Sequence, residues 1–208
     1  MRSRTTALLA TLALSLAVAA AGAAAAEAAP VWKFDGHELV GEETVAGVGG
    51  PTVLTVPGAT VTCAHVALVF KISNSAGHAL GEMNEVPFYE CTTAAKGCTV
   101  QSISAERLPW PMHVAPGPIG PVPKYYLVFE GVRISIEFSG ELCALSGNPV
   151  RLKGSIGGQF SSSTLTFNKA SYEATGTGLK VGTEKAELTG TFPLEAFGSH
   201  HGETLELS

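Results

Sequence analysis

The chain has 208 residues, 45% of them hydrophobic, and a formal net charge of −5. This length is typical of one domain with a substantial core. Basic residues form no cluster along the sequence, since even Arg133, Arg151 and Lys153 are spread over strand-like segments. A nucleic-acid-binding protein is therefore disfavoured, and the acidic balance is explained more simply by solubility.

The first 26 residues have the layout of a secretory signal peptide. Two arginines precede an apolar run, Ala7–Ala26, which ends in small residues with an A-x-A cleavage site. Cleavage is predicted after Ala26, so that the mature protein begins at Glu27 and spans residues 27–208. A retained membrane anchor is the alternative, because the run is almost long enough to span a bilayer, but its alanine-rich end is only weakly hydrophobic. We therefore predict a secreted protein, or one associated with the cell envelope, with no membrane segment after cleavage.

The mature region is predicted to consist almost entirely of short β-strands, because β-branched and apolar residues alternate with turn residues throughout. No sustained helical period is present. The predicted strands are Thr52–Val56, Thr60–Lys71, Tyr125–Phe129, Val132–Phe138, Val150–Phe160, Thr164–Phe167, Leu179–Val181, Ala186–Leu194 and Thr204–Leu207. Many short strands at close spacing predict an all-β, single-domain antiparallel sandwich, with a β-barrel as the alternative.

The strongest local pattern is the alternation in Val132–Phe138, where every second residue is apolar. This period of two predicts a strand with one buried and one exposed face. The preceding Glu130-Gly131 has turn composition, so Tyr125–Phe129 and Val132–Phe138 are predicted to form a hairpin. Gly157-Gly158 indicates a bend or bulge in a later strand, and the segment 73–77 is predicted to be a turn.

Residues 109–123 hold six prolines and are predicted to form a long surface loop that joins two β-rich halves. The loop carries Trp110, Met112 and His113, which could contact a sugar or an apolar partner from a rigid support. Alternatively, Trp110 folds back and closes one end of the core, and we favour this interpretation.

All four cysteines lie in the mature region, and an even number in an exported chain predicts two disulfides. No C-x-x-C motif is present, so a zinc ribbon or redox site has no support. A short loop separates Cys91 from Cys98, which could place them on neighbouring strands, and we predict Cys91–Cys98 and Cys63–Cys143 as the pairs.

Three cysteine-bearing segments resemble a family of secreted, uncharacterised β-rich proteins of high-GC soil actinobacteria. The segments are TVTCAHV, FYECTTAAKGCTVQSISAERLPWP and ISIEFSGELCALSGNPVRLKGSIGG, and the resemblance extends over most of residues 31–195. It implies export and a shared scaffold with four cysteines, and it implies no particular activity or ligand.

Catalytic motifs are sparse. The segment 73–77 lacks the first glycine of a serine-hydrolase elbow, and the chain has a single aspartate, Asp35, so a Ser-His-Asp triad is disfavoured. Paired carboxylates of a glycoside hydrolase are harder to exclude, because residues distant in sequence can meet on a sheet. The candidates are Glu82, Glu85, Glu90, Glu137 and Glu141, although exposed strand faces commonly carry such residues.

The six histidines give no metal motif, and the single aspartate makes a calcium site improbable. His200-His201 is interpreted as an exposed tail, and His65, two residues after Cys63, as a partly buried strand residue. We therefore expect no metal and no cofactor. The favoured function is that of a non-enzymatic binding or structural domain with a possible carbohydrate or cell-envelope partner. A hydrolase using glutamate pairs and a carrier of small apolar ligands are the alternatives.

Overall fold

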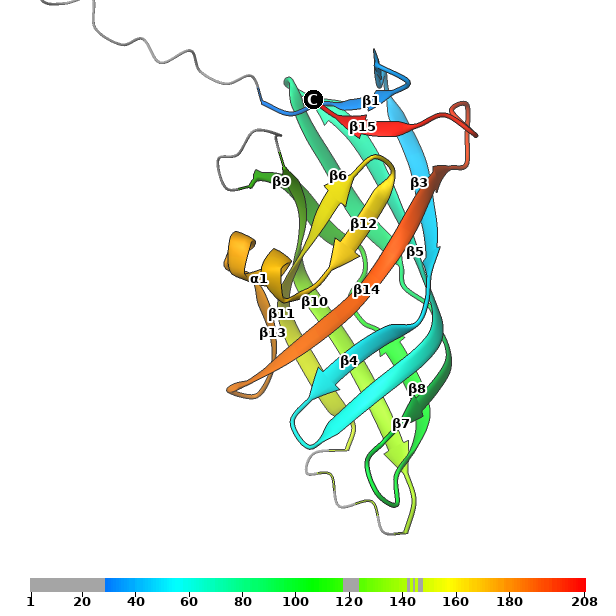
Figure 1. Ribbon diagram of the computed structural model, residues 1–208, viewed down its shortest axis with the longest axis vertical. Coiled ribbons are helices and arrows are strands. Elements are labelled where there is room, and N and C mark those ends of the chain that lie inside the picture. The colour runs from blue at the N-terminus through cyan, green and yellow to red at the C-terminus, as the bar shows by residue number, and fades with distance from the viewer. Residues whose placement is uncertain (1–28, 118–123, 142, 144, 146–147) are drawn as a thin grey trace, which may run out of the picture.

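The computed structural model describes residues 29–117, 124–141, 143, 145 and 148–208 (Figure 1). The predicted signal peptide lies outside this part of the chain. The elements in chain order are β1 (Trp32–Phe34), β2 (His37–Glu38), β3 (Glu42–Gly49), β4 (Thr52–Val56), β5 (Ala59–Ser75), β6 (His78–Glu85), β7 (Phe88–Thr93), β8 (Thr99–Ala105), β9 (Trp110–Pro116), β10 (Tyr125–Ser139), β11 (Val150–Ser161), β12 (Thr164–Phe167), α1 (Lys169–Thr175), β13 (Gly178–Val181), β14 (Glu184–Ala196) and β15 (Leu205–Leu207).

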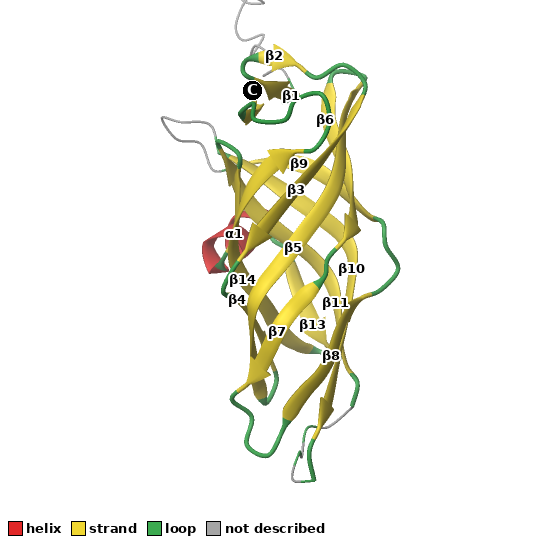
Figure 2. Cartoon of the chain, turned by 90° about the vertical axis from the view of Figure 1, so that its right-hand side faces the viewer, coloured by secondary structure: helices red, strands yellow, loops and turns green. Residues whose placement is uncertain are grey.

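These strands confirm the predicted all-β antiparallel sandwich. Twelve of them form one sheet, in the order β12-β11-β13-β14-β3-β5-β6-β9-β10-β8, with β4 and β7 as side branches. Because β10 also pairs with β11, the hydrogen bonding runs round the molecule without a break. Figure 2 looks onto β3, β5 and β7, with β10, β11 and β13 behind them. The two layers of the sandwich are thus joined by hydrogen bonds along both edges, through β14 with β3 and through β9 with β10.

Phenylalanine side chains fill the space between the layers. Phe70 on β5 lies 6.2 Å from Phe129 on β10, measured between ring centroids. Phe129 in turn lies 6.3 Å from Phe167 on β12, which lies 5.8 Å from Phe192 on β14. All four rings are almost completely buried, so they form a continuous aromatic core across the sandwich.

A second small sheet, β15-β1-β2, covers one end of the sandwich, at the top of Figure 1. Its Trp32 is fully buried, donates a hydrogen bond from the indole nitrogen to the Leu80 carbonyl at 3.0 Å, and meets the ring of Phe160 edge-on. The side chain of Asn74 bridges this sheet to β5 by bonding the backbone of Trp32 and Leu39. β5 continues to Ser75, so Asn74 belongs to this strand. The turn predicted for 73–77 is therefore confined to Ala76 and Gly77.

The alternation predicted in Val132–Phe138 is confirmed, because its apolar residues are buried. The hairpin predicted around Glu130-Gly131 is wrong. β10 continues through these residues and pairs with β11 on both sides, Phe129 with Ile156 and Val132 with Gly154. One extra residue on β10 makes this a β-bulge. Gly131 has φ of 65°, the left-handed conformation that both tight turns and such bulges use, and the composition alone therefore suggested a turn.

The predicted surface loop at 109–123 is also wrong in its first part. Trp110–Pro116 forms β9, which pairs with β6 and with β10, and residues 118–123 lie outside the described residues. Pro111 precedes the stretch that pairs with β10, and Pro116 ends that stretch. These two prolines thus flank the ladder with β10 and do not interrupt it, while Pro111 is opposed to Glu82 on the β6 side.

Two disulfides are present, as predicted, but the predicted pairing is wrong. The bonds join Cys63 to Cys91 and Cys98 to Cys143. Cys63 and Cys91 are directly opposed where β5 pairs with β7, and their Cα atoms are 3.9 Å apart. A Cys91–Cys98 bond required β7 and β8 to form a hairpin, whereas β8 pairs with β10 and brings Cys98 to the segment that follows that strand.

The alternation of buried and exposed residues along β5 shifts by one position after Cys63. Cys63 is buried, but the next inward residue is Val66, so His65 is exposed rather than partly buried as the sequence suggested. The change falls where the partner of β5 passes from β4 to β3, between the pairs Thr52 with Cys63 and Gly49 with Val66. A change of phase in a strand reverses the direction of every later side chain.

Candidate functional site

The structure separates the three residues predicted as a surface contact. Trp110 and Met112 are buried, with 1% and 3% of their surface exposed, and both belong to the main core cluster. The Trp110 indole nitrogen donates a hydrogen bond to the Glu106 carbonyl at 2.9 Å. Trp110 therefore lies in the core, as the favoured interpretation required, and neither residue is presented for contact.

His113 is exposed on β9, and its Nδ1 atom lies 3.6 Å from a carboxylate oxygen of Glu130. This contact directs Glu130, which sits in the β10 bulge, toward β9. His113 alone does not form a contact surface with the two buried residues beside it.

Two of the five glutamates considered for hydrolysis make local polar contacts, and Glu85, Glu90 and Glu141 are exposed. Glu82 accepts a hydrogen bond from Asn84 at 3.1 Å, and Glu137 accepts one from Ser102 at 3.1 Å. None of these residues lines the groove that is described next.

The histidines and the other candidate ligands do not converge. Among the residues that the structure describes, no group of three or more His, Cys, Asp or Glu side chains is arranged to hold a metal ion. His200 stacks on Phe34 at 4.3 Å and contacts Glu203 at 3.0 Å, so it packs against the end sheet, while His201 is exposed.

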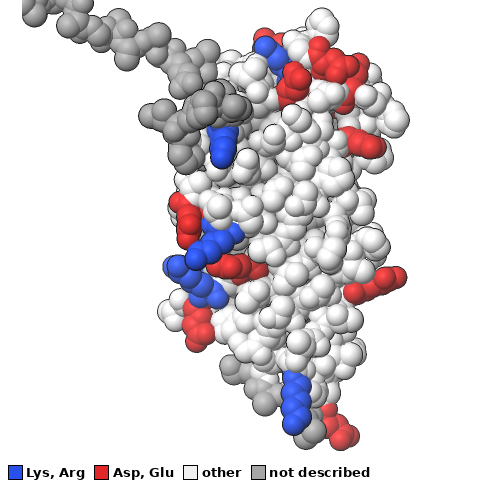
Figure 3. Space-filling view, viewed as in Figure 1, with Lys and Arg blue, Asp and Glu red and all other residues white. Residues whose placement is uncertain are grey.

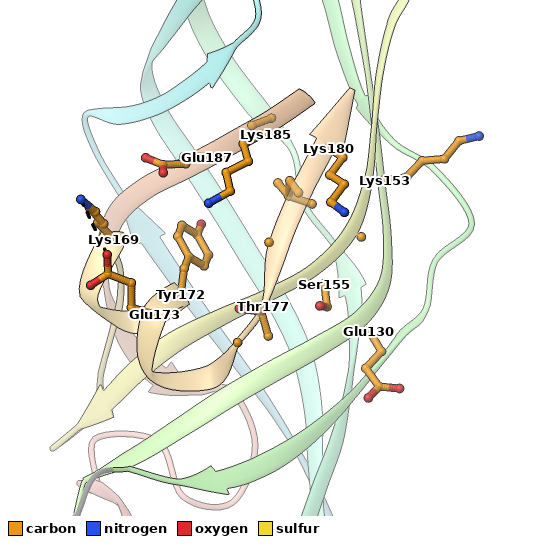
Figure 4. A pocket seen from close by; sticks show the side chains of 15 residues that line it. Glu130, Lys153, Ser155, Lys169, Tyr172, Glu173, Thr177, Lys180, Lys185 and Glu187 are labelled. Atoms are coloured by element: carbon orange, nitrogen blue, oxygen red, sulfur yellow. Dashed lines mark ion pairs between the residues drawn. The ribbon is translucent and has the colours of Figure 1, made fainter. Parts of the chain in front are cut away.

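A groove of about 790 Å³ lies on the outer surface, between the helix α1 and the strands β11, β13 and β14 (Figure 4). Four of the 13 Lys and Arg residues of the chain line it, together with three glutamates, so the groove concentrates charge. These residues are Lys153, Lys169, Lys180, Lys185, Glu130, Glu173 and Glu187.

Local sequence explains why the wall of the groove is helical. Asn168 caps the N-terminus of α1 by accepting a hydrogen bond from the Ser171 backbone at 2.9 Å, and Gly176 ends the helix in the left-handed conformation. A side chain at Gly157 would collide with Thr175, so this glycine lets the helix lie directly on β11. The helix was not predicted, because seven residues are too few to show a helical period.

Tyr172 anchors the helix to β14. Its hydroxyl donates a hydrogen bond to the Leu188 carbonyl and accepts one from the Leu188 N–H at 3.2 Å. Burial, with a smaller contribution from the charge of Glu187, raises the pKa of Tyr172 well above its usual range, and the bond to Leu188 offsets this only partly. The side chain is therefore neutral and structural, and it fixes the wall of the groove.

The strand register creates a second feature, which we call the basic row. Arg133 on β10 is directly opposed to Lys153 on β11. Lys153 is opposed to Lys180 on β13, and Lys180 is opposed to Lys185 on β14. Directly opposed residues share one face of a sheet, with Cβ atoms about 5 Å apart. Four cations on four neighbouring strands therefore form a line on the outer face, and three of them line the groove.

No carboxylate that the structure describes forms an ion pair with the basic row. Among the described residues, no carboxylate oxygen lies within 4.0 Å of its charged nitrogens, and two of the three groove glutamates have other partners. Glu173 pairs with Lys169 at 3.6 Å, and Glu130 contacts His113. Figure 4 shows Lys180 and Lys185 pointing into the groove while Lys153 extends away from them. Figure 3 shows several blue side chains at the edge where α1 and β13 lie, with red side chains among them.

Sequence reasoning missed this row because its members are far apart in the chain and separated by turns. The prediction that the basic residues form no cluster is wrong for the folded protein, because four of them lie on directly opposed positions of neighbouring strands. The alternation within β10 and β11 indicated that Arg133 and Lys153 point outward, but only the order and register of the strands place them side by side.

Comparison of this chain with protein-family models, with curated proteins and with solved structures found no match. The two disulfides indicate that the protein folds in an oxidising environment. None of the helices that the structure describes has the length and apolar character needed to cross a bilayer.

Proposed function

We propose that this protein is an exported, non-enzymatic binding domain that holds an anionic ligand on the basic row, where the row borders the groove. Export rests on the predicted signal peptide, and the disulfides agree with an extracellular or envelope location. The resemblance to secreted four-cysteine proteins points to the same compartment.

The observation that carries the proposal is the direct opposition of four cations without a carboxylate partner among the described residues. Like charges opposed across strands destabilise a sheet. Glu106, whose backbone N–H donates a hydrogen bond to the Arg133 carbonyl, and Glu187, two residues from Lys185, lie beside the row, but neither forms an ion pair with it. Binding surfaces commonly keep an arrangement of side chains that lowers the stability of the free protein. A bound anion would remove the repulsion between the four cations.

The packing of the interior favours surface binding over carriage of an apolar ligand. Phe70, Phe129, Phe167 and Phe192 occupy the space between the two layers, where a carrier would need a cavity. The hydrolase alternative has less support, because the candidate glutamates lie outside the groove. The proposed site is also a fixed one, since Tyr172 and the helix caps hold its wall.

Equilibrium binding to dextran sulfate, with neutral dextran as the control ligand, tests the proposal. The oxidised protein is titrated at low and at physiological salt concentration, and heat or fluorescence polarisation of labelled polymer is recorded. We expect binding to dextran sulfate alone, and we expect it to weaken as salt rises, because screening shortens the range of the interaction to about 8 Å at 0.15 M.

The variant Lys180→Gln/Lys185→Gln removes two charges from the row, and Lys96→Gln/Lys124→Gln removes two exposed charges elsewhere. The first should lose most of the binding and the second should retain it. Equal losses in both variants would mean that only net charge matters, and the absence of binding by the unmodified protein would refute the proposed function.

A further inference from the structure

The basic row has a defined length and direction. Neighbouring strands are about 4.8 Å apart, so four cations on four strands extend over about 14 Å, perpendicular to the strands. Lys180 and Lys185 point into the groove, Lys153 extends to its other side, and Arg133 lies one strand further, on β10. A small anion reaches two neighbouring cations at most, whereas a chain with repeated charges reaches all four.

We infer that the ligand is a linear anionic carbohydrate polymer that crosses β10, β11, β13 and β14 along the basic row. The inference rests on the proposed function and adds the class and the direction of the ligand. Its anionic groups are carboxylates or phosphates that repeat at intervals comparable to the strand spacing. Each contact is an ion pair at an exposed site, so affinity comes from the number of pairs.

The hydroxyl groups of the site favour a carbohydrate. Ser155 and Thr177 line the groove among the lysines and are partly accessible. The Thr177 hydroxyl shares a hydrogen bond with Thr175 at 2.7 Å and keeps one further bond for a ligand, so both residues can bond sugar hydroxyls between the charged contacts. The backbone of Gly154 and Gly178 also lines the groove and lets a chain approach the sheet closely. Such polar, solvent-exposed lining suits a hydrated polymer better than an apolar one.

Nucleic acid fits the site less well. Single-stranded nucleic acid binds through exposed aromatic rings that stack on bases, and the one aromatic residue of the groove, Tyr172, is buried with its hydroxyl engaged. Duplex DNA carries one charge per about 1.7 Å of its axis, which is far denser than the row. The acidic remainder of the protein would repel such a ligand, whereas a sparsely charged polymer makes contact at the row alone.

The first test is calorimetric titration of the oxidised protein with galacturonate oligomers of one to six residues. Fully methyl-esterified oligomers, which keep the chain and lose the charge, are the matched control. A second arm uses hexose oligomers of similar lengths joined by phosphodiester bonds, and a third uses oligothymidylate. We expect affinity to rise at least tenfold from one to four repeats in the carboxylate or the phosphate arm, then level off once the row is spanned. The arm that binds more tightly identifies the anionic group.

The second test separates the row from the groove. Arg133→Gln removes the cation furthest from α1, and Lys169→Gln removes a groove cation that lies on the helix, outside the row. If the polymer crosses the strands, Arg133→Gln should weaken hexamer binding about fivefold and lower the salt dependence by about one unit of log K per log salt, while Lys169→Gln changes affinity less than twofold. Arg133→Lys, which keeps the charge, should restore most of the binding, and circular dichroism checks that each variant is folded.

The outcomes distinguish the inference from the function on which it rests. Equal affinity for one and for six repeats would refute the inference that the ligand is a polymer and would leave a site for a small anion. A larger loss of hexamer affinity in Lys169→Gln than in Arg133→Gln would have the same meaning. Tighter binding of oligothymidylate than of either carbohydrate would overturn the carbohydrate class. Binding of none of these anions, dextran sulfate included, would refute the proposed function itself.

Discussion

Replacing Lys180 by glutamate should make the folded protein more stable, although it changes an exposed residue in a strand. Lys180 is opposed to Lys153 on one side and to Lys185 on the other. Lys180→Glu therefore converts two repulsive pairs into two attractive pairs, and cross-strand pairs contribute roughly 0.2–1 kcal/mol each. The diagonal neighbours, Arg151 and Glu187, carry opposite charges and largely offset each other. We expect the free energy of unfolding to rise by about 1 kcal/mol.

Denaturant and thermal unfolding at 10–20 mM salt measure this gain, which corresponds to an increase in Tm of about 2–4 °C for a protein of this size. At 1 M salt the Debye length falls to about 3 Å, shorter than the spacing of the row, and most of the gain should disappear. Lys180→Gln, which only removes the repulsion, should give about half the effect. Lys96→Glu, at an exposed position in the turn between β7 and β8, should give almost none. A loss of stability in Lys180→Glu at low salt would refute the argument that the row is a strained arrangement.

Three structural predictions and one on processing can be checked independently. Trp110→Ala should lower the free energy of unfolding by about 3–5 kcal/mol, as other truncations of buried aromatic residues do, and a loss below about 1 kcal/mol would contradict its place in the core. Because the pKa of Tyr172 is raised in the folded state, its contribution to stability is complete below pH 10 and falls as pH rises above that value; Tyr172→Phe should flatten this alkaline decline in unfolding measurements. Peptide mapping without reduction should recover a Cys63–Cys91 peptide, and a free thiol at either position would contradict the observed bond. Mass spectrometry of protein from a secreting host should give an N-terminus within a few residues of Glu27, and full-length protein in the membrane would show the signal-peptide prediction to be wrong.

The free energy of unfolding and the affinity for anionic polymer can be measured together in one series of variants. Lys180→Glu should be more stable and bind anionic polymer more weakly, so the two measurements move in opposite directions. Structural residues such as Trp110 should behave differently, because their truncation lowers stability without a direct effect on the charge of the site. This contrast separates a functional row of cations from a row that is merely tolerated.

Some properties of this protein followed from local sequence alone. The alternation in Val132–Phe138 predicted both the strand and its buried face, because the side-chain period of a strand is a property of the backbone. The four cysteines predicted two disulfides, since an even number of thiols in an exported chain forms bonds. The glycine at 131 indicated a left-handed residue, but a bulge and a turn both use that conformation, and the continued pairing of β10 with β11 decided between them.

Two features depended on tertiary structure: which cysteines form disulfides, and which basic residues become neighbours in the basic row. Cys91 lies closer in sequence to Cys98 than to Cys63, but the pairing of β7 with β5 places it directly opposite Cys63. Likewise, Lys153 and Lys180 are separated by a strand and a helix, and they become neighbours only because β11 pairs with β13 in one particular register. The sequence determined which side chains point outward from each strand. Which of them meet depends on long-range hydrogen bonding between strands, and that pairing is set by the packing of the whole core.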